Sequence, residues 1–242
     1  MKLFASIILV FLFSQAYSQN GMWNYTVSTE SSNPISMSGA AIISPGGDDI
    51  TVNFNWPFNA WIYNDYYKVS DTLYLNSNGI MRFDRSLWEG AGRASAYPVF
   101  PTNDNVYGQC ISYGGNTDGH ISGDIKQKVS GVAGSYVLTI AFTYFTHYSG
   151  TTAYHADIQI SFYESNRNIR IDYSNVGGST NPALHLGVNA GDSIWGADYA
   201  ASFPSADIAY LFTPGPIVSI NHAEFSGSMK LAVMPNPSID IF

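Results

Sequence analysis

The sequence predicts an all-β fold: an antiparallel β-sandwich in a single main domain, with a short C-terminal linker and a truncated β segment after it. Three observations support this fold class. Several segments alternate apolar and polar residues, turn residues recur between them, and no window has a convincing helical repeat. The alternation is strongest from Ser135 to Tyr173, where three successive segments are expected to form a meander at the centre of a sheet.

The expected strands begin soon after the N-terminus. Residues 22–27 are predicted to form the first strand, and the Ser- and Asn-rich residues 28–38 are predicted to form a loop. Residues 51–58 alternate between apolar side chains and asparagines. Pro57 cannot donate a ladder hydrogen bond, so this strand is expected at a sheet edge or to end there.

A hairpin is expected around Asn78-Gly79, because both residues accept positive φ between two alternating runs. Leu73–Leu75 leads into this turn and Met81–Phe83 follows it. From residue 86 to residue 119 the alternation fades, which indicates either short irregular strands or a functional excursion from the domain.

The second half of the chain contains the predicted meander. Its first segment places every second residue from Tyr136 to Tyr144 on one apolar face, and residues 156–162 and 169–173 repeat the pattern. The polar residues 164–168 are expected to form the turn of a hairpin. Further strands are predicted at 121–129, before a glycine turn at 131–134, and at 184–188 and 208–212.

The first 18 residues have the pattern of an export signal. Lys2 supplies a positive charge, residues 3–13 are almost wholly apolar, and small residues precede the expected cleavage between Ser18 and Gln19. The apolar run is shorter than the roughly 20 residues of a membrane-spanning helix, and no later run is long enough. The mature chain is therefore expected to be exported, without a transmembrane segment.

Charge and cysteine content restrict the partners. The net charge is −8, and it becomes −9 once Lys2 is removed with the signal. The basic residues form no run that would follow a phosphate backbone, so nucleic acid is not an expected partner. Cys110 is the only cysteine, which excludes an intrachain disulfide. It is interpreted as a small buried hydrophobe, with a reactive or intermolecular thiol as the alternative.

The C-terminal region changes in composition after the main domain, which is expected to cover residues 19–213. Residues 214–228 are predicted to be a linker, and residues 229–242 begin a new segment that contains Pro235, Asn236 and Pro237. This segment resembles the start of the C-terminal sorting domain of the type IX secretion system in Bacteroidetes, where a short apolar strand runs into Pro-Asn-Pro. The resemblance implies recognition by the type IX secretion machinery. Members of that family continue for several more strands, so this sorting domain is expected to be incomplete.

The main domain resembles a second family. Two patterns between about residues 53 and 188 are similar to nidogen-like domains: Trp56-Pro57-Phe58 followed by Ser77-Asn78-Gly79, and Ala156–Tyr163 followed by Glu164, Ile169 and Tyr173. This resemblance implies a β-rich module of the kind found in adhesive and matrix proteins. The middle block of the family, with its tryptophan and acidic residue, is not recognisable between residues 90 and 119.

The candidate binding residues form an aromatic platform. Sugar rings stack their apolar faces on aromatic side chains, and neighbouring amides and carboxylates supply hydrogen bonds. The candidates are Trp61, Tyr63, Asn64, Asp65, Tyr66 and Trp195, with Tyr67 beside them. The alternative is that these rings belong to the core or to its rim.

The sequence contains few residue patterns that indicate a catalytic or metal-binding site. There is no Gly-x-Ser-x-Gly elbow, and only four glutamates are available as partners for a glycosidase pair. One candidate zinc site is formed by three residues that flank a single loop, His147, His155 and Asp157. The alternative is that these residues lie on a solvated strand face. Calcium is a possible cofactor in three oxygen-rich loops, at residues 103–105, 116–118 and 189–192. These residues also build ordinary turns.

The sequence thus predicts a secreted or cell-surface protein of non-catalytic role. We expect an adhesion or glycan-binding module whose partner is an extracellular glycan or a surface protein. The alternatives are a secreted hydrolase acting on polysaccharide or protein, and a structural component of an extracellular matrix. A hydrolase would require a carboxylate whose replacement blocks turnover, whereas a matrix component would self-associate.

Overall fold

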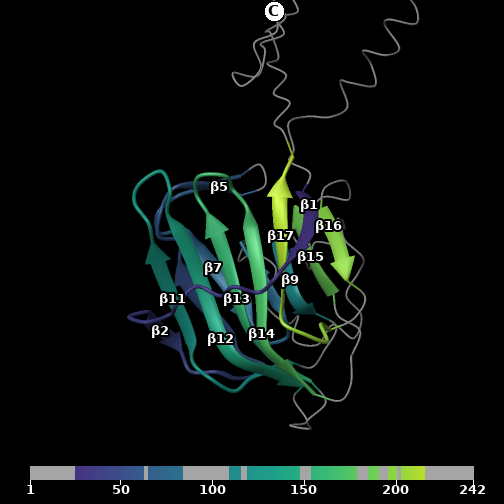
Figure 1. The fold of residues 1–242 in the computed structure, drawn as a ribbon. Helices are drawn as coiled ribbons and strands as arrows, with labels where there is room; N and C mark the ends of the chain where they lie inside the picture. Colours follow the sequence, from purple (N-terminus) through teal and green to yellow (C-terminus); the bar gives the residue numbers. More distant parts are fainter. Residues whose placement is uncertain are drawn as a thin grey trace, which may run out of the picture. The chain divides into compact units, whose positions relative to one another are not determined.

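A computed structural model describes residues 25–62, 65–83, 109–115, 119–147, 154–178, 185–190, 196–200 and 203–215. Within these residues every regular element is a strand, and all the strand pairs are antiparallel (Figure 1). Two large sheets pack face to face, and residues 24–214 form one compact unit. The predicted class, an all-β antiparallel sandwich, is confirmed. No helix in the described part of the chain is long and apolar enough to cross a membrane.

The larger sheet is built around the predicted meander. Its strand order is β1 (Tyr25–Glu30), β17 (Ile208–Pro214), β14 (Ile169–Gly177), β13 (His155–Tyr163) and β12 (Val137–His147). The far side of β12 is shared by two strand pairs: β11 (Ile125–Ser130) with β2 (Ala41–Ser44), and β10 (Gly119–Ile121) with β3 (Gly47–Asp48). The meander β12-β13-β14 therefore lies in the middle of the sheet, as its alternation predicts.

The smaller sheet covers one face of the larger sheet. Its order is β16 (Gly196–Ala200), β15 (His185–Ala190), β9 (Gln109–Gly115), β8 (Ile80–Arg82), β7 (Thr72–Asn76) and β4 (Thr51–Asn55). β4 is an edge strand that ends just before Pro57, as expected. A separate two-stranded hairpin follows it, formed by β5 (Ala60–Ile62) and β6 (Asp65–Tyr67).

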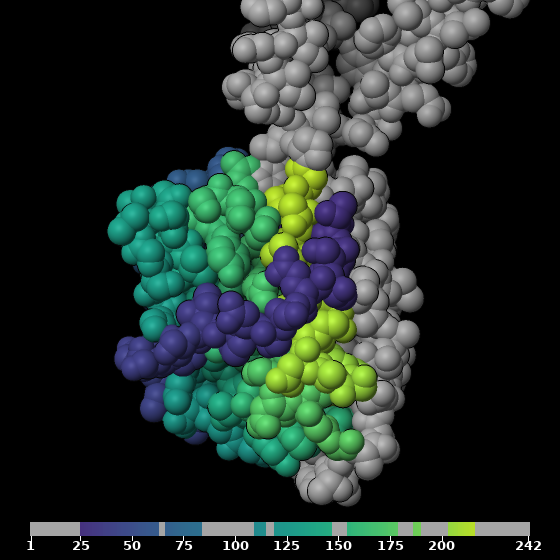
Figure 2. All heavy atoms as spheres, in the orientation of Figure 1, coloured from purple at the N-terminus to yellow at the C-terminus, as the bar shows by residue number. Residues whose placement is uncertain are grey.

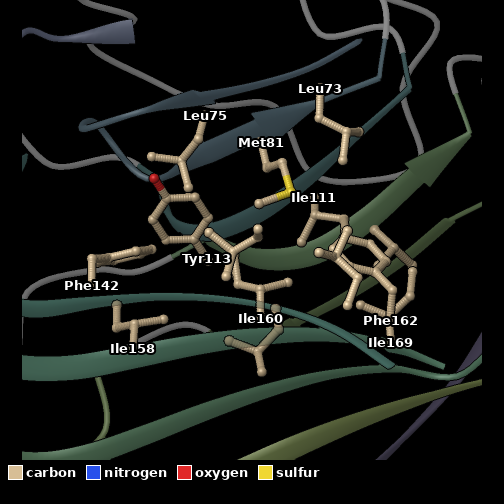
Figure 3. Packing of buried hydrophobic residues seen from close by; sticks show 14 of the residues in the cluster. Leu73, Leu75, Met81, Ile111, Tyr113, Phe142, Ile158, Ile160, Phe162 and Ile169 are labelled. Carbon is tan, nitrogen blue, oxygen red and sulfur yellow. The ribbon is translucent and has the colours of Figure 1, made fainter. Parts of the chain in front are cut away.

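The core lies between the two sheets (Figure 3). Leu75, Met81 and Ile111 project from the smaller sheet toward Ile158 and Ile160 of β13, and all five side chains are fully buried. Each large apolar side chain buried in this way contributes about 1.5–3 kcal/mol relative to exposure. The period-two pattern therefore fixes which face of each strand meets the other sheet.

A β-bulge interrupts the alternation in β12. The sequence pattern places Tyr144 on the inner face with Phe142, but Tyr144 is 42% exposed and Phe145 is buried instead. The register with β13 shifts between Phe142 and Phe145, and Tyr144 has a φ of 54°. Thr143 and Tyr144 both point outward and together oppose the single residue Asp157, so β12 contains one extra residue at this bulge. The expectation for Tyr144 is therefore wrong, because the pleat slips by one residue.

The hairpin between β7 and β8 is present, but its turn differs from the expectation. Of the turn residues 77–79, all of them described, only Gly79 has positive φ, at 92°. The Gly79 amide donates to the Asn76 carbonyl at 3.1 Å. A type I turn that ends in a left-handed glycine explains this geometry, and it requires one positive φ rather than two. The side-chain oxygen of Asn78 accepts a hydrogen bond from the Gly119 amide at 2.9 Å.

Other strand boundaries also differ from the sequence prediction. β1 begins at Tyr25 and includes residues 28–30, which were expected to lie in a loop. β2, β3 and β16 are short strands without clear alternation, and none was predicted. The expected signal peptide and sorting segment lie outside the described residues, as do residues 84–108 and 216–228. The start of the expected linker is different from the prediction, because Pro214 belongs to β17.

Residues 31–40, which we call the strap, cross the outer face of the larger sheet. The strap leaves β1 at one edge and reaches β2 at the other, and it appears as a purple band in Figure 2. From β1 to β2 there are six strand-to-strand steps, which at about 4.8 Å each amount to about 29 Å. Ten extended residues reach about 33–36 Å. The strap is therefore long enough to cross the sheet, and it ends in a turn in which the Ala40 amide donates to the Met37 carbonyl at 3.1 Å.

Candidate functional site

The predicted aromatic platform lies on the β5–β6 hairpin. Trp61 and Tyr66 are register partners across the two strands, so their side chains project from the same face. Their ring centroids are 5.3 Å apart and the rings are tilted by 54°. The two residues are 43% and 44% exposed, which is unusual for side chains of this size. The structure thus brings together two of the predicted binding residues.

The opposite face of the same hairpin is anchored in the core. Ala60, Ile62 and Tyr67 are buried there. The Tyr67 ring lies 5.1 Å from that of Phe83, and its hydroxyl donates a hydrogen bond to Oε1 of Gln109. Tyr67 is therefore part of the core, so for this ring the alternative interpretation, a core residue rather than a platform residue, is confirmed. The burial of Tyr67 fixes the hairpin that carries Trp61 and Tyr66 on its outer face.

Hydrogen bonds close the base of the hairpin. The Val69 amide donates to Oδ1 of Asn59 at 3.1 Å, and the Ser70 amide donates to the Trp56 carbonyl at 2.9 Å. The Trp56 amide in turn donates to the Asp71 carbonyl at 2.7 Å. With both arms tied together, little conformational entropy remains for the Trp61–Tyr66 pair to lose when a ligand binds.

The remaining predicted platform residues are not placed. Tyr63, Asn64 and Trp195 lie outside the described residues. The backbone of Asp65 pairs with Ile62 in the hairpin, but its side chain is outside the description. The described part of the platform consequently offers two tilted aromatic faces, and these suit the apolar face of a sugar ring or an apolar side chain of a protein.

The nucleophile candidate Cys110 is buried in the smaller sheet. It is 0% exposed, and this burial raises the pKa of its thiol to about 12, an effect that the nearby Arg82 charge only partly opposes. The thiol is therefore neutral near pH 7 and inaccessible, whereas a nucleophilic cysteine needs an exposed thiolate. The interpretation of Cys110 as a small buried hydrophobe is confirmed.

Two of the four glutamates have structural partners. Glu164 accepts a hydrogen bond from the Tyr136 amide at 2.9 Å, which ties the β13–β14 turn to β12. Glu30 forms an ion pair with Arg170, which also binds Asp172 with 2.7 Å between Nε and Oδ2. These contacts give both carboxylates a role in the fold.

The described residues contain no group of three or more His, Cys, Asp or Glu side chains placed to hold a metal ion. His155 stacks on Tyr144, and Asp157 accepts a hydrogen bond from the Tyr144 amide at 2.8 Å. The oxygen-rich loops considered for calcium, at 103–105 and 116–118, lie outside the described residues, and so do residues 191–192.

The domain matches the model of a known protein family. The family model described as NIDO related matches residues 24–214, which is nearly the whole described domain. Searches of curated proteins and of solved structures found no match.

Proposed function

The chain belongs to the NIDO-related family over residues 24–214, and from this premise we propose that it is a non-catalytic extracellular module that captures glycans on the Trp61–Tyr66 pair. The family assignment supports an extracellular β module, and the fold supplies the rigid scaffold on which surface residues bind. Adhesion to a glycan-bearing surface is the role that follows from such a module.

The observation that carries this proposal is the contrast between the two faces of the β5–β6 hairpin. The inner face is fixed by buried side chains, while the outer face exposes two aromatic rings that the core does not use. Aromatic rings held in this way bury area on a ligand at a low cost in conformational entropy. A tilted pair contacts two sides of a sugar chain rather than one flat ring.

The test is glycan-array binding by a chain of residues 19–242, run with calcium and with a chelator. We expect a defined sugar class to bind, with affinity reduced at least about tenfold in both Trp61→Ala and Tyr66→Ala, a loss of about 1.4 kcal/mol or more. Val132→Ala is the matched control, because Val132 is 70% exposed on a turn outside the hairpin. Normal binding by both aromatic variants contradicts the proposal. Loss of binding with chelator moves the site to the Asn- and Asp-rich loops.

For export we propose cleavage between Ser18 and Gln19, followed by passage through the type IX secretion machinery. The support is the apolar leader together with the Pro235-Asn236-Pro237 motif. Expression in a bacterium with an intact type IX system, and in the same strain lacking it, tests the route. Equal amounts of protein outside both strains would contradict passage through the type IX machinery and would not bear on cleavage between Ser18 and Gln19.

A further inference from the structure

The strap is fixed to the larger sheet by side chains on three strands. Gln159 of β13 bonds both backbone groups of Ile35, accepting from its amide at 2.8 Å and donating to its carbonyl at 2.9 Å. Asp172 of β14 accepts from the Asn33 amide at 3.0 Å, and Lys128 of β11 donates to the Ser36 carbonyl at 2.6 Å. The strap thus forms a fixed wall across the outer face.

A groove of about 330 Å³ runs beside this wall, between the strap and the outer faces of the neighbouring strands. The polar residues that line the groove are Asp124, Lys126, Thr143, Asp157 and Ser174. Asp157 and Ser174 are register partners on β13 and β14, so their side chains form one row parallel to the strap. This row presents one carboxylate and one hydroxyl side by side.

An aromatic shelf borders the groove on the side away from the strap. Tyr144 and His155 stack with ring centroids 4.8 Å apart and an interplanar angle of 13°. His155, Asp157 and Gln159 are alternate outward residues of β13, so the shelf, the groove and the strap follow one another at about 7 Å intervals along that strand.

The shelf depends on two local features of the backbone. The bulge turns Tyr144 outward, and the Asp157 carboxylate holds its amide in that conformation. Gly177 is the register partner of His155, and a Cβ atom there would lie 2.6 Å from Cε1 of the His155 ring. The absent side chain at Gly177 therefore leaves room for the ring.

From this arrangement we infer that the groove between the strap and the Tyr144–His155 shelf is a binding site for one ring of a neutral saccharide. The carboxylates of Asp124 and Asp157 accept hydrogen bonds from sugar hydroxyls, and Lys126 donates one. The exposed face of Tyr144 stacks on the apolar face of the ring. The volume is at the lower end of the range for small-molecule sites.

The charges of the groove favour this ligand class over others. The two carboxylates outnumber the Lys126 ammonium, so the groove repels an anionic ligand. A wholly apolar ligand would leave the carboxylates and hydroxyls without partners on desolvation, which is costly. A neutral ligand rich in hydroxyls satisfies both the carboxylates and the ammonium.

The test uses amide chemical shifts of the chain of residues 19–242, titrated with cellohexaose, maltohexaose, mannohexaose and xylohexaose. We expect one of these probes to shift amides around Thr143, Asp157 and Ser174. Tyr144→Gly should weaken this binding at least tenfold, and glycine suits the positive φ at that position, so the fold is retained. Asp124→Asn should weaken it several-fold, because one carboxylate acceptor is lost.

Trp61→Ala separates this site from the hairpin site. It should leave the groove shifts unchanged, so loss of binding at the hairpin and loss at the groove are distinguishable. The inference is overturned if none of the four probes shifts the groove amides. It is equally overturned if Tyr144→Gly, with its native spectrum otherwise intact, binds as well as wild type.

Discussion

Replacing Asp172 by Asn should destabilise the domain far more than the equivalent change in Glu30, although both carboxylates bind the same arginine. The Asp172 side chain is 3% exposed and its oxygens lie 2.7 and 3.0 Å from Nε and Nη2 of Arg170, while the Glu30 side chain is 43% exposed. Breaking a buried ion pair by removing one partner costs about 3–5 kcal/mol. Exposed pairs contribute about 0–1 kcal/mol.

The assay is urea denaturation of the wild type, Asp172→Asn and Glu30→Gln at pH 7. We expect the free energy of unfolding to fall by about 3 kcal/mol or more in the first variant and by less than about 1 kcal/mol in the second. For a domain of this size, the larger loss lowers Tm by about 6–12 °C. Asp172→Asn also weakens the bonds to the strap, so amide exchange should accelerate at Asn33. Similar losses in both variants would refute the argument from burial.

Three further predictions follow from contacts described above. The raised pKa of Cys110 means that the unfolded thiol, with an ordinary pKa of 9.0, ionises first. The stability that this group contributes is present below pH 9 and is lost as the pH rises toward about 12. The free energy of unfolding of the wild type should therefore fall more steeply between pH 8 and 10.5 than that of Cys110→Ala. Equal slopes in the two proteins would contradict this prediction. Gly177→Ala should displace the His155 ring, and it should lower the free energy of unfolding by less than about 1 kcal/mol because the His155 side chain can move aside. Unchanged ring-current shifts at Tyr144 would contradict this displacement. Gln159→Ala should release the middle of the strap and cost about 1–3 kcal/mol, read by urea denaturation and by faster exchange of the Ile35 amide; protection equal to wild type would show that Gln159 does not hold the strap.

The sequence predicts the parts of this fold that depend on period-two patterning. The meander and the hairpin at residues 164–168 follow from alternation and turn residues, because every inward residue of β13 is apolar. The alternation does not reveal the bulge, because Phe142, Tyr144 and Phe145 are all aromatic and the pattern therefore fits either register. The sequence predicts only a loop for residues 28–38, because the strap's partners Gln159 and Asp172 lie more than a hundred residues away in the chain.

The candidate site was predicted only in part, for a related reason. Trp61 and Tyr66 stand out by composition, but Tyr67 differs from them only in which side of a three-residue strand it occupies. The groove residues Asp124 and Thr143 give no local signal, because strand pairing alone brings them to the groove. His155 and Asp157 stand out in the sequence as metal-ligating residue types, but nothing local indicates that His155 stacks on Tyr144.

The pairing of β1 with β17 has a consequence for how the molecule is assembled. Thr26 of β1 donates a hydrogen bond to Thr213 of β17, across 187 positions of sequence. Contacts this distant form slowly, because the chain must close a very long loop before they contribute any free energy. The side chains that fix the strap lie only 92 to 139 positions from it, on strands that precede β17. A chain stopped short of its last strand therefore lacks the partner of β1, although it already contains every residue that fixes the strap and lines the groove.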